Sequence, residues 1–344
     1  DFEALTRDEM LSKLPLEEID VSGNSLKGGG LRALVRGLAT STTLQTFICQ
    51  HCSLDAKLGE RIGPLFRTAS LRHLDIGYNK LGDGGVRKIM NLAAQQRQLT
   101  YFDCSATGIK SSTASVLARW LNHNTQLKVL KCAWNNLGPA GLLFGKAVAK
   151  HNSLQELDVS RTNLGKTIEF MIRGAGACIS MKRVHLSQNT IDIKAQRHLV
   201  RMINDGACQL THLYVRDCHL SSKCTGGLFL TLKRPEIKLV YLDIAVNKID
   251  KEPLAKHIGQ CLSEAKTIET LHLAATGLNM KTLSHILDGV AQCPSIHTLH
   301  LDGHPRAKRW LKPLSRVVDG GKCQLKELTL RNCNVTEDDT IEFL

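Results

Sequence analysis

The side chains in this sequence that could do chemistry are histidines, cysteines and a small set of aromatic residues. His272 and His300 occupy the same position in two neighbouring copies of one repeated phrase, so their strands would lie about 4.8 Å apart. His297 and Asp302 fall on the same expected surface, and such a group could ligate zinc. We favour a solvated histidine cluster, because the repeat alone aligns these residues, and we predict no metal site.

Twelve cysteines in 344 residues are too dilute for a small disulfide scaffold. Most of them recur at fixed places in the repeat, where a small buried side chain is needed. Cys49 and Cys52 form a Cys-x-x-Cys pair, but no second pair follows at zinc-finger spacing. We therefore predict reduced thiols in the core and, from them, a cytoplasmic protein.

Signatures of the common enzyme classes are missing from the sequence. It contains no P-loop, no G-x-G-x-x-G after a strand, no H-E-x-x-H and no G-x-S-x-G. Aspartates and histidines do recur at one strand position, but a repeat places them there without any acid–base chemistry. We predict a protein that is not an enzyme and that needs no cofactor.

Large amphipathic side chains fall at positions expected to be exposed on strands, which makes them candidates for contact with another protein. Tyrosine and tryptophan are enriched among the residues that dominate protein interfaces. The alternative is that these rings only cover neighbouring strands. The predicted protein-binding residues of the concave face are Tyr78, Tyr101, Trp134, Arg183, Tyr214, Tyr241, His272 and His300.

One repeated phrase supplies the elements that would position these side chains. Residues 71–81 follow the pattern L-x-x-L-x-L-x-x-N-x-L, which is the leucine-rich repeat signature. Twelve matches at so regular a step establish the repeat. The phrase begins at residues 16, 44, 71, 99, 127, 154, 181, 210, 239, 268, 296 and 325, in steps of 27 to 29 residues.

Each repeat divides into a strand half and a helix half. Apolar residues alternate in the first half, as in residues 127–132, and recur at helical spacing in the second, as in residues 85–92. Glycine-rich turns such as residues 81–85 and 137–141 link the halves. We predict an α/β leucine-rich repeat solenoid, a ribonuclease-inhibitor-like horseshoe with a parallel sheet on the concave face and helices on the convex face.

The ninth position of the phrase supports this fold independently. Asparagine alternates there with cysteine or threonine, and we expect burial, because small hydrogen-bonding side chains satisfy the backbone where the strand turns away. The alternation indicates two repeat types, and His304 breaks it. The position reads Asn24, Cys52, Asn79, Thr107, Asn135, Thr162, Asn189, Cys218, Asn247, Thr276, His304 and Cys333.

The domain organisation follows from where the phrases begin and end. We expect residues 1–15 to form a helical lead-in or cap, and residues 16–344 to form a single repeat domain of about 12 units. The chain begins with Asp1 rather than Met, and its last unit stops at Leu344 inside the helical half. We expect the native protein to continue beyond this end.

Composition and charge exclude several classes of protein. Hydrophobic residues make up 42% and charged residues 22%, which is typical of a core-forming chain, and no apolar run approaches the roughly 20 residues that span a bilayer. The net charge of +13 suggests acidic proteins, nucleic acid or anionic lipid as partners. The concave positions carry about ten basic and about a dozen acidic residues, which argues against nucleic acid. The basic excess must sit mainly on helices and loops.

One segment is strongly basic and falls outside the regular phrase. It could contact anionic lipid or an acidic protein, although a solvated helix face is the favoured interpretation. Peripheral contact with a membrane therefore stays open. The residues of this basic patch are Arg306, Lys308, Arg309, Lys312 and Arg316.

The phrase and its alternating ninth position, over residues 16–344, resemble the ribonuclease-inhibitor-like leucine-rich repeat superfamily. Within it the chain is most similar to the repeat domain of CARMIL, the capping protein/Arp/myosin-I linker, as in residues 239–249, 268–278 and 325–330. The resemblance implies a non-enzymatic protein-interaction scaffold within a larger actin-cytoskeleton regulator. It also implies a membrane-binding domain before the repeats, and dimerisation and capping-protein-binding segments after them.

Two alternatives remain open. A GTPase regulator similar to the Ran GTPase-activating protein would need a catalytic arginine at a defined place and usually carries a strongly acidic tail, whereas this chain is basic. The ligand-sensing repeat domain of an innate immune receptor, or a pathogen effector, would also fit the repeats. A nucleotide-binding module upstream would favour the receptor.

Overall fold

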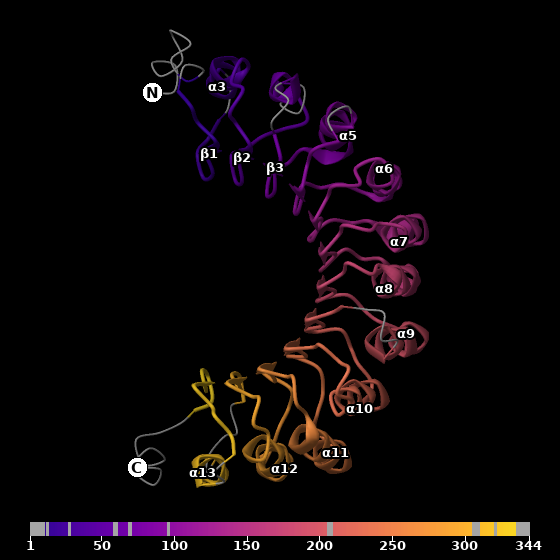
Figure 1. The fold of residues 1–344 in the computed structure, drawn as a ribbon, viewed down its shortest axis with the longest axis vertical. Coiled ribbons are helices and arrows are strands. Elements are labelled where there is room, and N and C mark those ends of the chain that lie inside the picture. Colours follow the sequence, from indigo (N-terminus) through magenta and orange to yellow (C-terminus); the bar gives the residue numbers. More distant parts are fainter. Residues whose placement is uncertain are drawn as a thin grey trace. The chain divides into compact units, whose positions relative to one another are not determined.

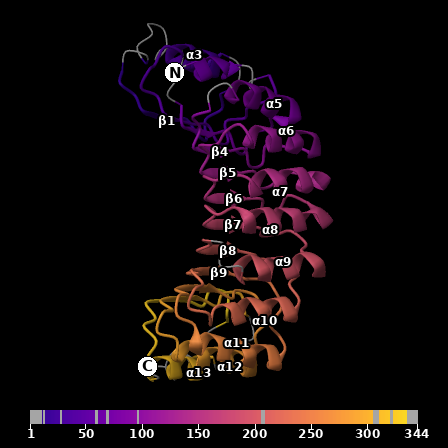
Figure 2. The same ribbon diagram turned by 45° about the vertical axis from the view of Figure 1, so that its right-hand side comes forward.

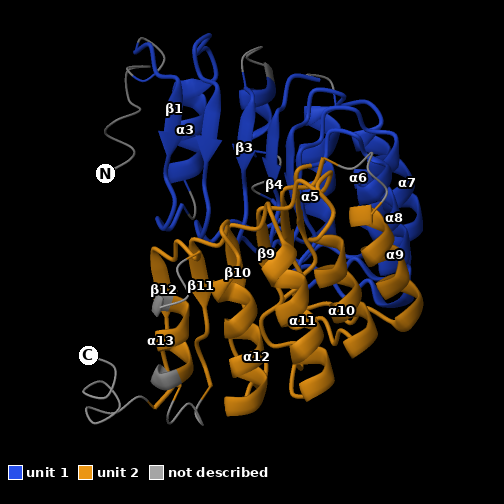
Figure 3. Cartoon of the chain, turned by 60° about the horizontal axis from the view of Figure 1, so that its bottom comes forward, with its two compact units in different colours: residues 1–181 blue, residues 182–344 orange. Residues whose placement is uncertain are grey.

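The structure is a computed structural model whose chain divides into two compact units, unit 1 (Asp1–Met181) and unit 2 (Lys182–Leu344) (Figure 3). The lead-in over residues 1–15 falls mostly outside the described residues and stays a prediction, as does the single domain over residues 16–344. Residues 67, 311–312 and 318–319 are described without their side chains. The described residues are 11, 14–26, 29–57, 61–67, 71–94, 97–204, 209–304, 310–319 and 322–334.

Each unit contains six short parallel strands in sequence order, every one at the third to fifth positions of its phrase. The strands of unit 1 are β1 (Glu18–Asp20), β2 (Thr46–Ile48), β3 (His73–Asp75), β4 (Tyr101–Asp103), β5 (Val129–Lys131) and β6 (Glu156–Asp158). Those of unit 2 are β7 (Arg183–His185), β8 (His212–Tyr214), β9 (Tyr241–Asp243), β10 (Thr270–His272), β11 (Thr298–His300) and β12 (Glu327–Thr329).

Helices cover one side of the strands in each unit (Figure 1; Figure 2). Unit 1 has α3 (Gly30–Leu38), α5 (Gly82–Ala93), α6 (Ser111–Leu121), α7 (Gly141–Ala149), α8 (Ile168–Ala177) and the 3₁₀ segments η1 (Gly63–Arg67), η2 (Gly138–Ala140) and η3 (Gly165–Thr167). Unit 2 has α9 (Ile193–Asn204), α10 (Ser222–Thr231), α11 (Glu252–Glu264), α12 (Met280–Ala291) and α13 (Leu311–Asp319). The predicted α/β solenoid is confirmed.

The core lies between the strands and the helices of each repeat. The middle residue of a strand points into it, as Leu130 does in β5, while Lys131 stays half-buried on the opposite side. We name that opposite side of the strands, which no described helix covers, the open face. The alternation of apolar and polar residues therefore selects the buried face of every strand.

The glycine-rich segments differ from the predicted turns. Residues 82–85 already belong to α5, and residues 138–140 form the 3₁₀ segment η2 directly before α7. Gly82 and Gly138 take the left-handed φ values of +61° and +50° that bring the chain from the strand half into the helix. The glycine-rich segment is therefore already the start of the helical half. The spacing of apolar residues alone does not reveal this.

The ninth position is buried throughout the described repeats except at Asn24, which is exposed. Asn135 shows what the position does. Its Oδ1 accepts from the backbone N–H groups of Thr107, Gly108 and Ile109, and its Nδ2 donates to three carbonyls, including that of Cys104 at 2.9 Å. Asn79 and Asn247 make the same kind of bonds, so each of these three asparagines ties its own loop to the loop before it.

The other residue types make smaller sets of bonds at this position. Thr107 donates to the carbonyl of Cys104 at 2.6 Å, and the thiol of Cys218 lies 3.4 Å from the carbonyl of Leu186. The Nε2 of His304 lies 3.0 Å from the carbonyl of Leu273, which occupies the place that an asparagine at this position would reach. His304 therefore breaks the alternation of residue types but still contacts the carbonyl that an asparagine would bond.

Glycines set the closest helix contact of unit 1. A Cβ on Gly145 of α7 would lie 2.2 Å from the carbonyl oxygen of Phe170 in α8. A Cβ on Gly174 of α8 would lie 2.2 Å from the carbonyl oxygen of Gly145 in turn. Only glycine at these two positions lets α7 and α8 approach so closely.

Candidate protein-binding face

The predicted interface residues divide into two groups. Most lie on strands of the open face and are half-buried: Tyr101 on β4, Arg183 on β7, Tyr214 on β8, Tyr241 on β9, His272 on β10 and His300 on β11. Tyr78 and Trp134 were expected on strands but follow β3 and β5, in loops with φ values of +56° and +58°. Because these loops turn outward, the two rings are 41% and 48% exposed.

Five rings of unit 2 contact one another in series across β7–β11, and we name them the ring ladder: His185, Tyr214, Tyr241, His272 and His300. The distances between successive ring centroids are 4.0, 4.6, 5.1 and 3.8 Å; the first and last pairs are stacked, and Tyr241 is tilted against both of its neighbours. Parallel register aligns the two stacked pairs, whereas Tyr241 meets its neighbours diagonally, because Tyr214 and His272 both pair with Asp243.

Hydrogen bonds hold the ring ladder in place. The hydroxyl of Tyr241 lies 2.8 Å from Nε2 of His272, and Nδ1 of His300 lies 2.8 Å from the hydroxyl of Thr329. These contacts engage ring nitrogens that a zinc ion would otherwise use. Within the described residues, no group of three or more potential ligands is arranged to hold a metal ion.

Burial favours the neutral form of two members of the ring ladder. It lowers the pKa of His272 to about 4, helped by His300 and by the positive charge of Arg216. Burial also raises the pKa of the Tyr241 hydroxyl. The centre of the ladder therefore presents neutral, partly exposed rings.

The open face of unit 1 is built around carboxylates instead. Asp75 and Asp103 stand opposite each other in the β3–β4 register, and they are only 3% and 5% exposed. Each accepts the backbone N–H two residues later, at 3.0 Å from Gly77 and 2.7 Å from Ser105. Burial, and the charge of Asp75, raise the pKa of Asp103 to about 6. Through these hydrogen bonds the two aspartates fix the start of the loops that follow their strands.

Rings on this face stack in separate pairs. His51 and Tyr78 lie 4.5 Å apart between centroids, and His73 and Tyr101 lie 3.8 Å apart. Trp134 lies under the guanidinium of Arg161, whose Cζ is 4.1 Å from the ring centroid. The rings on the open face of unit 1 therefore lie in separate pairs, next to charged side chains such as Arg161.

Charge also separates the two open faces. Positions two, three, five, seven and eight of each phrase are the ones expected to face outward. At these positions unit 1 has more acidic residues, Glu17, Glu18, Asp20, Asp75, Asp103, Glu156 and Asp158, than basic ones, Arg72, Lys128, Lys131 and Arg161. Unit 2 is balanced, with Asp217, Asp243, Glu269, Asp302 and Glu327 against Lys182, Arg183, Arg216, Lys326 and Arg331. The near-neutral face predicted from the whole sequence therefore averages an acidic unit and a neutral one.

Sequence reasoning overlooked the histidines that complete these stacks. His185 extends the ring ladder beyond Tyr214, and His212 lies 5.5 Å from Tyr241 between ring centroids. Both occupy the same strand positions as the predicted residues. That equivalence was the available signal, because residues at equivalent positions of adjacent strands become neighbours.

The predicted basic patch falls mostly outside the described residues. Arg306, Lys308 and Arg309 are not among them, nor is the side chain of Lys312. Arg316 is exposed on α13 and lies 3.4 Å from a carboxylate oxygen of Asp288 in α12. None of the described helices has the length and apolarity needed to cross a bilayer.

Comparisons with known proteins agree with the fold. A family model described as "Leucine Rich repeat" matches residues 69–90. Mouse (Mus musculus) ribonuclease inhibitor is 22% identical over 327 residues, covering 93% of this chain and 72% of that protein. The mouse NACHT, LRR and PYD domains-containing protein 12 is 28% identical over 221 residues, covering 60% of this chain and 20% of that protein.

A solved structure extends this similarity in three dimensions. The yeast Rad7 and Elc1 complex contains a chain that superposes with a TM-score of 0.65 at 14% identity, covering 98% of this chain and 84% of that one. At this identity the similarity concerns the fold alone.

Proposed function

We propose that this chain, a leucine-rich repeat protein of the ribonuclease-inhibitor-like superfamily, is a non-enzymatic scaffold that binds a protein partner on the open face of unit 2. The observation that carries the proposal is the ring ladder, an unbroken series of contacts between five rings on five strands, stacked at both ends and tilted at Tyr241. Repeats of this kind are typically non-enzymatic and bind protein partners along an extended surface.

The physical properties of the ladder suit it to this role. Tyrosine rings contribute large contact areas at a small cost in side-chain entropy, and rings already held by stacking lose little freedom on binding. The neutral state of His272 also lowers the cost of removing water from the face. A partner that packs aromatic or aliphatic side chains against the rings would use these properties.

The finer proposal is a cytoplasmic actin-cytoskeleton regulator similar to CARMIL. Its support is the resemblance of residues 239–249 and 268–278 to CARMIL repeats. The cytoplasmic location is supported by the described cysteines, which are all free and are buried apart from the half-buried Cys323.

Affinity capture with two matched variants tests both levels of the proposal. Tyr214→Ala with Tyr241→Ala interrupts the ladder, whereas Tyr78→Ala with Trp134→Ala removes two exposed rings of unit 1. We expect the first variant alone to lose a partner that the parent chain binds in cytosolic extract. Recovery of actin regulators would support the finer role, while equal recovery by parent and ladder variant would contradict the ladder as the site.

A second candidate function is inhibition of a ribonuclease. It is favoured by the similarity to mouse ribonuclease inhibitor and by the acidic open face of unit 1, which would attract a basic partner. The test is ribonuclease activity with and without the chain. Inhibition that Asp158→Asn and Glu156→Gln weaken would support it, and unchanged activity at excess chain would exclude it for the enzyme assayed.

A further inference from the structure

The helix side of unit 1 carries charge of the opposite sign to its open face. Residues 111–121 of α6 and 141–149 of α7 contain no aspartate or glutamate. Three cations, Arg119, Lys146 and Lys150, lie exposed along these two helices or directly after them. The sequence predicted that the basic excess sits on helices and loops, and here it concentrates beside a groove.

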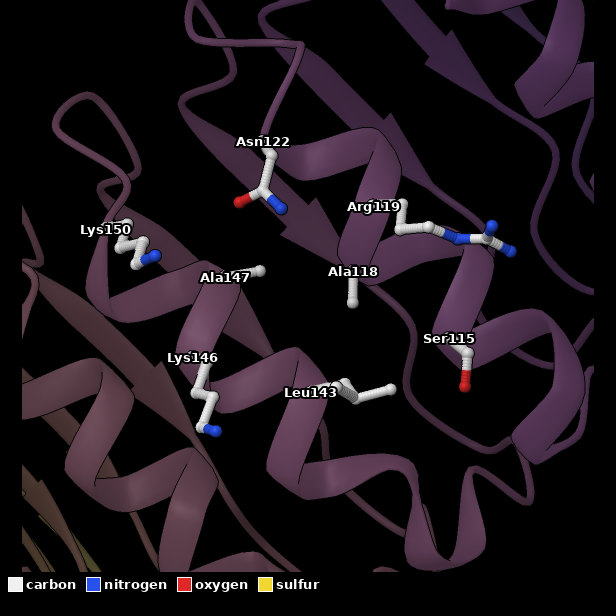
Figure 4. Close-up of a pocket in the computed structure, with 8 residues that line it drawn as sticks. All are labelled: Ser115, Ala118, Arg119, Asn122, Leu143, Lys146, Ala147 and Lys150. Carbon is white, nitrogen blue, oxygen red and sulfur yellow. The ribbon is translucent and has the colours of Figure 1, made fainter.

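The groove runs between α6 and α7 and has a volume of about 340 Å³ (Figure 4). Ala118 and Ala147 form its floor and are each 4% exposed. Leu143 extends from α7 toward α6 and is 53% exposed, which leaves an apolar side chain in solvent beside this floor. The residues that line the groove are Ser115, Ala118, Arg119, Asn122, Leu143, Lys146, Ala147 and Lys150.

Carboxylates on the flanking helices are engaged elsewhere. Asp83 of α5 accepts from the hydroxyl of Thr113 and from the backbone N–H of Lys110. Glu169 of α8 is buried and pairs with Arg173, at 3.9 Å between the closest charged atoms. The groove cations have no ion pair among the described residues, so their charge is available to an external ligand.

The lysines of the groove also repel each other. Lys146 on α7 and Lys150 directly after it are four residues apart, a spacing at which like charges on a helix destabilise each other. A carboxylate placed between them would relieve this repulsion. Arg119 extends along α6 away from the lysines, and it also lines the neighbouring groove between α5 and α6 (Figure 4). The positive charge is therefore spread along a length of surface.

A second depression of about 530 Å³ continues the groove past the C-terminal ends of α6 and α7. The two share Asn122, Ala147 and Lys150. The extension is lined by polar groups, including Gln126 and Asn152, that could bond a peptide backbone. A single small anion would fill only a fraction of this trough, whereas a chain segment would follow its length.

We propose that this groove binds an acidic, amphipathic segment of a partner protein. A leucine-sized side chain of the segment would rest on Ala118 and Ala147 beside Leu143, while its carboxylates would meet Lys146 and Lys150. The apolar floor at Ala118 and Ala147 favours a peptide over a membrane, because it is recessed between the two helices, where a single side chain of a peptide can reach it and a bilayer surface cannot. The chain would then hold one partner on the open face of unit 2 and a second, acidic one on the helices of unit 1.

Fluorescence anisotropy of the full chain with short labelled peptides tests the proposal. The probe is a peptide of glutamate and leucine at helical spacing, and the comparison peptide has lysine in place of glutamate. Lys146→Glu with Lys150→Glu should weaken binding of the acidic probe about tenfold at low salt. Lys110→Glu with Lys166→Glu makes the same charge change on exposed residues outside the groove and should change the affinity less than about twofold.

Two further measurements keep the outcome unambiguous. Leu143→Ser leaves the charge unchanged and should weaken the acidic probe severalfold, while thermal unfolding checks that each variant is folded. Equal losses in the two charge-reversed pairs, or no loss in Leu143→Ser, would overturn the groove as a peptide site. Groove-dependent binding to phosphatidylserine vesicles without binding to the acidic peptide would overturn it in favour of a membrane.

Discussion

The open faces of the two units use one backbone frame for different surfaces. In unit 1 the central strands carry the buried carboxylates of Asp75 and Asp103, and rings stack only in pairs. In unit 2 the corresponding positions carry rings on four of the strands β7–β11 and Asp243 on β9, where Tyr241 two residues earlier links the rings on either side. The strand positions are equivalent, so the residues chosen there decide the character of each face.

Burial has the same effect on both faces, although the groups differ. It raises the pKa of Asp103 to about 6 and lowers the pKa of His272 to about 4, and each change favours the neutral form. At these two buried strand positions the fold therefore disfavours charge of either sign. Charged groups are better tolerated in the loops that follow, where Arg161 lies over Trp134.

We expect the largest loss of stability from removing a ninth-position asparagine. Making this change once in each unit tests whether these asparagines support both units equally. Asn135→Ala and Asn247→Ala each remove a buried amide with at least five hydrogen bonds to backbone groups. We expect each to lower the free energy of unfolding by about 4 kcal/mol, because several buried groups lose their partners. Urea unfolding measures this loss. A loss confined to one variant would mean that the units do not share this support.

The close approach of α7 and α8 gives the next largest effect. Gly145→Ala places a methyl group against the backbone of Phe170 and should cost about 3 kcal/mol. Gly165→Ala puts the added methyl in open space, although its φ of +52° adds some strain, so its loss should be smaller. Thermal unfolding of the two variants makes the comparison, and equal losses would contradict the packing explanation.

Asp103→Asn tests how a buried carboxylate on the open face of unit 1 affects stability. The folded-state pKa of about 6 lies above the ordinary value of 3.8, so the folded chain binds more protons than the unfolded chain between these values. The free energy of unfolding therefore falls as pH rises through this window. Asparagine still accepts the N–H of Ser105, so we expect a gain of about 2 kcal/mol above about pH 7. Unfolding measured across this pH range should show a flatter profile for the variant.

His272→Gln tests the ring ladder of unit 2. The pH dependence of stability expected from His272 has the opposite sign to that expected from Asp103. The folded-state pKa of about 4 lies below the ordinary 6.5, so the contribution of the neutral ring is present above pH 6.5 and is lost as pH falls toward 4. Because the ring is partly exposed, we expect only about 1 kcal/mol of pH-dependent stability to disappear in the variant. A variant with the same acid-side slope as the parent would show that another group titrates there.

Much of this architecture could be predicted from residue types and spacing. Phrases recurring every 27 to 29 residues located all twelve strands in the described residues, and the alternation of Asn135 with Thr107 and Thr162 indicated the buried ninth position. Periodicity succeeds here because each repeat contacts only its neighbours. It failed at Tyr78 and Trp134, whose left-handed loop conformation places them beyond the strands.

The sequence by itself determined the repeat, its strand–helix order and the residues that face the core, because burial of apolar side chains at a fixed period permits one arrangement. Only the tertiary structure decided which side chains on the surface meet. His185 joins the ring ladder, and Leu143 lies beside Ala118, through packing between residues of neighbouring repeats. Such contacts depend on strand register, side-chain rotamers and loop conformation, and the period of the repeat predicts none of these.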